Sequence, residues 1–282
     1  YEALEPLQKI LVENLDKLTA AEDAIKALEE NPIRVTFVGD SITEGVGASN
    51  ASKNYVNQAG KLLGDEFTVF NAGVGGKTLL DTNDAYTDTS RYTEGKNFAP
   101  DVVTIMLGTN DSKTRYWGSG SAAYGAEAFA EQLTALINEY KSLPSNPVVF
   151  VATSPTVYGT AVDSINDPAV TEIVEVQKEV AAAEGCPVID INAFTKNHSD
   201  WFGDGVHPND NGYAQMATAF AEAIANVNTA SLSSLRIGDT EIPLEEGQYT
   251  YTGYLAAGDE MPQVSAENNY GADVTVEQAE DD

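Results

Sequence analysis

The sequence predicts an α/β fold: a three-layer α/β/α, flavodoxin-like sandwich with a five-stranded parallel sheet, plus a short C-terminal all-β segment. Three observations predict it. Short runs rich in Val and Ile, apolar on both faces, recur up to about residue 228, as in strands covered by helices on both sides. Amphipathic helical patterns separate these runs. After that point the helical patterns stop, and short alternating runs with Gly, Pro and Asp turns follow.

The elements follow in chain order. Apolar residues spaced by three, four or seven predict a helix over residues 3–30, which Asn31-Pro32 ends. Strands are expected at residues 33–38, 67–71, 102–107, 148–152 and 188–191. Helices are expected near residues 54–63, 126–143, 168–184 and 211–227. Right-handed crossovers between parallel strands then place helices on both faces of the sheet.

We expect three parts in the chain. Residues 1–32 form an N-terminal helix packed on the main domain, residues 33–228 form the main α/β domain, and residues 229–282 form a small β-rich segment. In that last segment, strand-like runs near residues 232–237, 242–244, 249–254, 264 and 274–276 resemble the start of a cadherin-like β-sandwich module.

The composition indicates an acidic globular protein. With 15 Lys and Arg against 44 Asp and Glu, the formal net charge is −29. Such a surface repels nucleic-acid phosphates and anionic membranes, so we expect no nucleic-acid partner. No apolar run reaches the length of a membrane-spanning helix, so no membrane span is expected.

The first strand ends in a Gly-Asp-Ser run at residues 39–41. In open α/β sheets, ligands bind outside the carboxyl ends of the strands. A serine at this strand-to-helix turn has an exposed hydroxyl and lies at the N-terminus of a helix. The alternative is that Ser41 only caps the helix.

The second strand ends in Asn-Ala-Gly-Val-Gly-Gly at residues 71–76. Glycines there let a substrate approach the backbone and leave N–H groups free as donors. A phosphate-binding P-loop is excluded, because its first glycine would fall on Asn71. The third strand ends in Gly-Thr-Asn-Asp at residues 108–111, which places the Asn110 carboxamide at the same edge unless this is only a turn.

One acid–histidine pair precedes the last predicted helix. Asp204 lies three residues before His207, so its carboxylate can reach Nδ1 of the imidazole and leave Nε2 to take a proton from serine. The alternative is a carboxylate that only caps the turn. The other histidine, His198, lies in a polar loop and is expected to be solvated.

Together these four blocks, in this order, resemble the SGNH (GDSL-like) hydrolase family over residues 33–227. The resemblance implies that Ser41 is the nucleophile, His207 the general base and Asp204 its orienting acid. It also implies an oxyanion hole formed by the Ser41 N–H, the Gly76 N–H and the Asn110 side chain. Gly76 is chosen over Gly73 and Gly75 because the family glycine lies five residues after the Asn at the strand end.

The stretch after the third strand resembles bacterial carbohydrate O-acetylesterases more than lipases. We therefore expect hydrolysis of O-acyl esters, O-acetyl above all, on carbohydrate through an acyl-enzyme intermediate. Four residues are expected to contact substrate: Asp40, Tyr116, Trp117 and Tyr158. The aromatic rings suit sugar faces, although they could equally anchor surface loops. A bacterial extracellular or cell-surface location is expected, with a signal peptide removed before Tyr1.

Other functions stay open at this point. A lysophospholipase- or thioesterase-like lipolytic enzyme would use the same serine chemistry, and a non-catalytic carbohydrate-binding module could keep the fold. A flavodoxin-like nucleotide binder is disfavoured by the failed P-loop and by an expected absence of basic residues near the strand ends. We expect no cofactor and no metal, because residues 81–84 with Asp88 lack the Gly and Glu of a calcium loop.

Overall fold

The structure is a computed structural model that describes residues 32–121, 123–159, 162–228, 232–237, 240–241 and 264–268. The predicted N-terminal helix lies outside these residues. The chain divides into two compact units between Ala221 and Glu222. The boundaries that the sequence places at residues 32 and 228 stay predictions.

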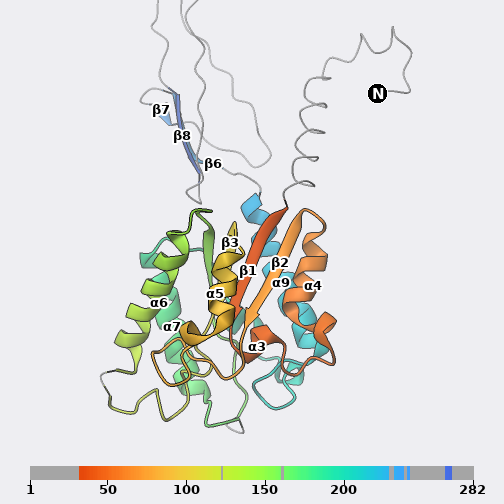
Figure 1. The fold of residues 1–282 in the computed structure, drawn as a ribbon, viewed down its shortest axis with the longest axis vertical. Coiled ribbons are helices and arrows are strands. Elements are labelled where there is room, and N and C mark those ends of the chain that lie inside the picture. The colour runs from red at the N-terminus through yellow and green to blue at the C-terminus, as the bar shows by residue number, and fades with distance from the viewer. Residues whose placement is uncertain are drawn as a thin grey trace, which may run out of the picture. The chain divides into compact units, whose positions relative to one another are not determined.

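A five-stranded sheet forms the centre of the first unit (Figure 1). Its strands are β1 (Ile33–Gly39), β2 (Phe67–Gly73), β3 (Val102–Met106), β4 (Val148–Ala152) and β5 (Val188–Ile189). They lie in the order β2-β1-β3-β4-β5, and every neighbouring pair is parallel. The strands are rich in β-branched residues, which pack well on a pleated, buried surface. The predicted five-stranded parallel sheet is confirmed.

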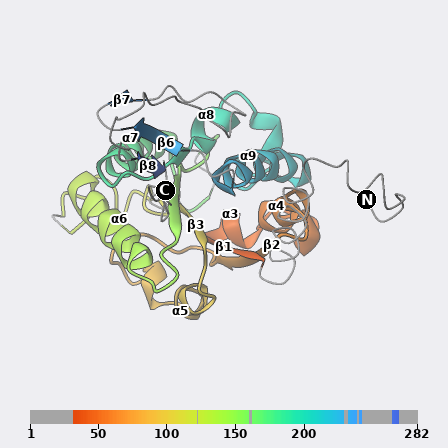
Figure 2. The same ribbon diagram turned by 90° about the horizontal axis from the view of Figure 1, so that it is seen from above.

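Helices cover both faces of this sheet, as the view from above shows (Figure 2). The covering helices are α4 (Tyr55–Leu63) and α9 (Asp210–Asn228) on one face, and α5 (Ser90–Asn97), α6 (Ala126–Lys141) and α7 (Asp167–Ala183) on the other. Neighbouring residues of β1 show the alternation: Phe37 contacts the rings of Tyr55 and Phe220, whereas Val38 joins the core cluster under α6 and α7. The three-layer arrangement follows from strands that are apolar on both faces.

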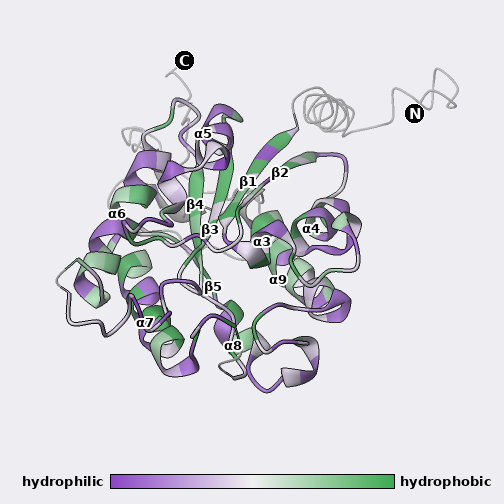
Figure 3. Cartoon of the chain, turned by 60° about the horizontal axis from the view of Figure 1, so that its bottom comes forward, coloured by the Kyte–Doolittle hydropathy of each residue, from purple (hydrophilic) through white to green (hydrophobic). Residues whose placement is uncertain are grey.

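Short elements fill the connections. They are the helices α3 (Ser41–Glu44) and α8 (Ile191–Thr195), and the 3₁₀ turns η1 (Ala51–Lys53), η2 (Tyr86–Asp88) and η3 (Ser199–Trp201). Colouring by hydropathy shows apolar inner strands and helices with polar stripes (Figure 3). No helix in the part of the chain that the structure describes is both long and apolar enough to cross a membrane.

The second unit contains an antiparallel sheet of β6 (Leu232–Ile237), β7 (Thr240–Glu241) and β8 (Val264–Asn268) in the order β7-β6-β8. Strands here agree with the all-β character predicted for the tail. The runs predicted at residues 242–244, 249–254 and 274–276 lie outside the described residues. The likeness of this tail to a cadherin-like module therefore stays a prediction.

Candidate active site

Three strands of the sheet end level with one another. Gly39, the last residue of β1, lies opposite Gly73 at the end of β2 and opposite Met106 at the end of β3. The loops that follow these strands therefore leave from one edge of the sheet. This is the edge at which open α/β sheets bind ligands.

The first of these loops places a serine on a helix N-terminus. Asp40 caps α3, because its Oδ1 accepts a hydrogen bond of 3.0 Å from the N–H of Ile42. Ser41 is the first residue of that helix and is buried, with 9% of its surface exposed. Its Oγ lies 2.9 Å from Nε2 of His207, although the two residues are 166 positions apart in the chain.

The histidine is held by the acid of its own turn. Nδ1 of His207 lies 2.7 Å from Oδ2 of Asp204. The other oxygen, Oδ1, accepts the backbone N–H groups of Val206 at 2.9 Å and of His207 at 2.7 Å. Partial burial acts to raise the pKa of Asp204, but the hydrogen bonds from His207 and these N–H groups outweigh it and hold that pKa below its usual range. A carboxylate that stays ionised fixes the imidazole tautomer with Nε2 facing Ser41.

The second loop, which follows β2, runs close to the serine, since a Cβ built on Gly75 would lie 3.6 Å from Cβ of Ser41. In the stretch that follows β2, the N–H of Gly75 donates to Glu44 and that of Lys77 to Val74. Gly76 has a φ of +78°, which suits glycine. Within the described residues its N–H has no protein acceptor, and the choice of Gly76 over Gly75 agrees with this pattern.

The third loop supplies a buried donor with no acceptor. Asn110 is 3% exposed, and its Nδ2 is buried without a hydrogen-bond partner in the part of the chain described. A buried amide that donates to nothing is costly, and a bound oxygen atom would relieve that cost. The roles of Asn110 and Gly76 as oxyanion donors stay predictions.

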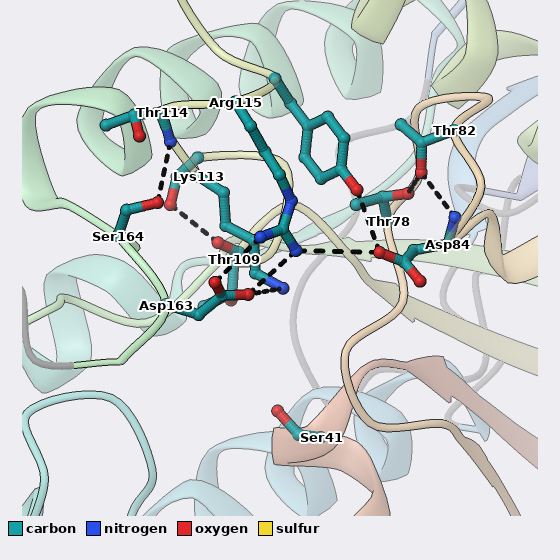
Figure 4. A network of polar contacts seen from close by, with 12 residues as sticks. Ser41, Thr78, Thr82, Asp84, Thr109, Lys113, Thr114, Arg115, Asp163 and Ser164 are labelled. Carbon is teal, nitrogen blue, oxygen red and sulfur yellow. Dashed lines mark hydrogen bonds and ion pairs between the residues drawn. The ribbon is translucent and has the colours of Figure 1, made fainter.

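A network of charged side chains joins the loops after β2, β3 and β4 (Figure 4). Arg115 forms a bidentate pair with Asp163 at 2.9 Å for each contact and lies 3.8 Å from Asp84. Lys113, almost fully buried, also binds Asp163 at 2.9 Å. These hydrogen bonds, from Arg115 first, lower the pKa of Asp163 to about 2. In the close view Ser41 lies beneath this network.

This network corrects one expectation. The sequence led us to expect no basic residue near the strand ends, but Lys113 and Arg115 both lie in the loop after β3. That expectation is wrong because the two cations stand close in the chain to the Asn110 turn. Both are paired with Asp163, and Arg115 also lies 3.8 Å from Asp84, so each cation faces a carboxylate.

The four residues expected to contact substrate are placed as follows. Asp40 is 1% exposed and caps α3. The Tyr116 hydroxyl donates to Asp84 at 3.0 Å, and Nε1 of Trp117 donates to Glu172 at 2.7 Å. Tyr116 and Trp117 are each less than a tenth exposed. Tyr158 is half-buried, and its hydroxyl donates to the backbone carbonyl of Thr195 at 2.6 Å. Contact of these residues with substrate stays a prediction.

Sequence reasoning missed two carboxylates at this edge. Glu44 accepts the N–H of Gly75, and Asp111 accepts the N–H groups of Leu79 and Leu80 at 3.1 and 2.7 Å. Each acid follows a predicted site residue closely in the chain, and that proximity was the available signal. Among the described residues, no group of three or more His, Cys, Asp or Glu side chains is arranged to hold a metal ion.

The arrangement has the parts of an acyl-transfer site. A serine hydroxyl lies within hydrogen-bond distance of an imidazole, and a carboxylate orients that imidazole. Serine is a weak nucleophile at its ordinary pKa and becomes reactive when a neighbouring base takes its proton. Hydrogen-bond donors that are aimed at the carbonyl oxygen of a bound ester can stabilise the negative oxygen of a tetrahedral intermediate.

Known proteins are similar to this chain in sequence and in fold. The sequence profile of the GDSL-like Lipase/Acylhydrolase family matches residues 37–215. An acetylxylan esterase of Xylanibacter ruminicola is 34% identical over 222 residues, which cover 71% of this chain and 45% of that protein. The chain thus matches less than half the length of this relative.

Two solved structures are also similar. The crystal structure of a lipase/acylhydrolase from Enterococcus faecalis matches with a TM-score of 0.55 and 25% identity, over 69% of this chain and 96% of that one. The crystal structure of an acetyl xylan esterase matches with a TM-score of 0.51 and 26% identity, over 68% of this chain and 100% of that one.

Proposed function

The chain belongs to the GDSL-like Lipase/Acylhydrolase family, and from this premise we propose that it is a serine esterase that removes O-acetyl groups from carbohydrate. Family membership makes it a carboxylic ester hydrolase. The observation that carries the serine mechanism is the contact of Ser41 Oγ with His207 Nε2 at 2.9 Å, with Asp204 on the far nitrogen at 2.7 Å.

In the first half of the proposed reaction, Ser41 Oγ attacks the carbonyl carbon of the ester while Nε2 of His207 takes the hydroxyl proton. The carbonyl oxygen becomes negative and accepts hydrogen bonds from three donors: the N–H groups of Ser41 and Gly76 and Nδ2 of Asn110. Support for this set is that none of the three has a protein acceptor within the described residues. Removing one such donor typically costs about 100- to 1000-fold in kcat.

In the second half, the tetrahedral intermediate collapses and the sugar oxygen leaves with the proton from His207. The acetyl group then remains on Ser41 Oγ as an ester. Water attacks this acetyl-enzyme while His207 takes one of its protons, and acetate departs as the serine regains its hydrogen. Asp204 stays ionised throughout and stabilises the imidazolium that forms in each half.

The acetyl group and the carbohydrate are proposed on two grounds. The curated relative with 34% identity is an acetylxylan esterase. In addition, a Cβ built on Gly75 would lie 3.6 Å from Cβ of Ser41, an ordinary van der Waals distance, so the backbone of this loop runs close to the serine. A secreted or cell-surface location suits a polymer substrate and the net charge of −29.

A series of aryl esters from two to twelve acyl carbons, run beside acetylated xylan and a lysophospholipid, tests this proposal. An added methylene gains about 0.8 kcal/mol where it meets an apolar surface and nothing where it stays in water. We expect kcat/KM to fall steadily beyond four carbons and acetate to be released from the xylan. A maximum at eight carbons or more, with fatty acid released from the lysophospholipid, would instead support the lipolytic alternative.

A further inference from the structure

Packing holds the two ends of the loop that carries the Gly76 N–H but not its middle, because Val74 packs against the core cluster and Leu79 and Leu80 belong to it. A Cβ built on Gly76 would meet no atom within 4 Å, so no neighbouring side chain fixes this residue from its Cα side. Two consecutive glycines also make this backbone more adaptable than any other pair would. A donor helps catalysis only when it is already aimed at the developing oxyanion. Something other than packing must therefore fix the Gly75–Gly76 peptide.

Glu44 is in the right place to do this. It is the last residue of α3, the helix that begins with Ser41, and its Oε2 accepts the N–H of Gly75 at 2.8 Å. A carboxylate that accepts a backbone N–H forms a charge-assisted bond, which is stronger than a neutral one. Because the same short helix carries the nucleophile and this acceptor, the bond ties the position of the loop to the position of Ser41.

The far end of the loop is held independently. Both carboxylate oxygens of Asp111 accept backbone N–H groups, from Leu79 at 3.1 Å and from Leu80 at 2.7 Å, and Asp111 is fully buried. Asp111 follows Asn110 directly, so the turn that carries one proposed oxyanion donor also anchors the loop that carries another. Between this anchor and Glu44, the Gly76 N–H is left without a protein acceptor in the described residues.

We propose that Glu44 is a positioning residue of the reaction: its hydrogen bond to Gly75 holds the adjoining peptide so that the Gly76 N–H faces the oxyanion. The inference rests on the proposed serine mechanism. Glu44 is exposed, so its bond contributes little to the stability of the fold. Its removal should therefore affect the transition state more than the folded state or the binding of the ester.

The test compares Glu44→Ala, Glu44→Gln and a matched control, Glu131→Ala, on an aryl acetate. Glu131 is an exposed glutamate of α6. Glu44→Ala should lower kcat about tenfold or more, because a misplaced donor loses a part of the effect that its complete removal would have. The KM of this variant should change less than about twofold. Glu44→Gln should keep at least about a third of kcat, because the amide oxygen can still accept the Gly75 N–H. Glu131→Ala should match the wild type.

A boronic acid inhibitor gives a second readout. Its adduct with a serine places a negative oxygen where the oxyanion forms, so its affinity should fall in Glu44→Ala by about the same factor as kcat/KM. The midpoint of the pH–rate profile should stay the same, since Glu44 does not contact His207 in the structure. The melting temperature of Glu44→Ala should stay within about 2 °C of the wild type.

Three results would overturn the inference: wild-type kcat in Glu44→Ala, an equal loss in Glu44→Ala and Glu44→Gln, or a loss confined to KM. The proposed function fails separately. A wild-type enzyme that cleaves aryl acetates but releases no acetate from glycan would refute the carbohydrate substrate and leave the Glu44 comparison valid. A wild-type protein without any ester hydrolysis would overturn both.

Discussion

Asp204 and His207 lie three residues apart, and this short separation explains why the sequence alone could predict their contact. A tight turn brings the carboxylate to Nδ1, and the same carboxylate closes the turn by accepting two backbone N–H groups. The partner of Nε2 is different, because Ser41 lies 166 positions away. That pairing was predicted from the resemblance to the SGNH hydrolase family, and it fits two residues at the carboxyl edge of a parallel sheet.

At this scale we predict that His207→Ala is far more damaging than Asp204→Asn. The serine and its base act as a unit, so losing the base should lower kcat by at least about 10⁴-fold on an aryl acetate. Asp204 only orients and stabilises the imidazole, so Asp204→Asn should retain at least about tenfold more activity than His207→Ala. Steady-state kinetics measure both. Equal losses, or a greater loss in Asp204→Asn, would contradict the assigned roles.

A second prediction concerns the buried carboxyl of Asp40. Burial raises its pKa from 3.8 to about 6, against the opposing effects of the Ile42 N–H, His207, Thr109 and Lys113. Since the folded state binds the proton more tightly than the unfolded state, this group lowers the free energy of unfolding as pH rises from about 4 to about 6. Asp40→Asn removes the titration and keeps a side chain that can cap α3.

Urea unfolding of wild type and Asp40→Asn across this pH range measures the effect. One pKa unit corresponds to about 1.4 kcal/mol of unfolding free energy. From pH 4 to pH 7, the free energy of unfolding of Asp40→Asn should therefore rise by about 2 kcal/mol relative to that of the wild type. The comparison uses the change with pH rather than the absolute stability, which the substitution also affects. A difference that stays constant from pH 4 to pH 7 would show that Asp40 does not titrate in this window.

Among the elements, the strands and the long helices were predictable, while the short helices were not. Runs apolar on both faces predicted all five strands, and apolar periodicity predicted α4, α6, α7 and α9 to within a few residues. The missed helix α5 is polar, and only Tyr92 and Gly95 of it are buried. It is stabilised by the Thr89 cap and by contact with the sheet, neither of which leaves a periodic pattern.

The same limit applies to the loops of the site. Glycines and an Asn at strand ends led to the prediction that the loops after β2 and β3 carry oxyanion donors, which stays a prediction. The acceptors that hold those loops were not predictable, because Glu44 and Gly75 are 31 positions apart and Asp111 and Leu80 also 31. Nothing in local sequence distinguishes a carboxylate that accepts a distant N–H from one that faces water.

The end of α9 carries a prediction at the scale of elements. The site residues Ser41, Gly76, Asn110, Asp204 and His207 all precede α9, which ends at Asn228. Deleting the chain after Asn228 keeps this helix and should leave kcat on an aryl acetate within about twofold of the full chain. Circular dichroism would establish that the shortened protein is folded. A folded truncation that has lost its activity would show that the chain after Asn228 contributes to the site.

For the molecule as a whole, the parallel sheet explains why so few residues account for the proposed chemistry. Three strands that end level with one another bring the proposed nucleophile, the proposed backbone donor and the proposed side-chain donor to one edge. The connection after β5 then returns the histidine to the same edge before α9 begins. Family membership agrees with this reading, since the matched region, residues 37–215, spans every site residue named above.

The most direct measurement is acetate release from acetylated xylan by the wild-type chain and by Ser41→Ala, at equal protein concentration. The account predicts steady release by the wild type and none above background by Ser41→Ala, whose fold should be unchanged because the serine hydroxyl adds little packing. Melting curves of the two proteins provide the control. Release by Ser41→Ala at more than a few per cent of the wild-type rate, or no release by the wild type, would contradict the account.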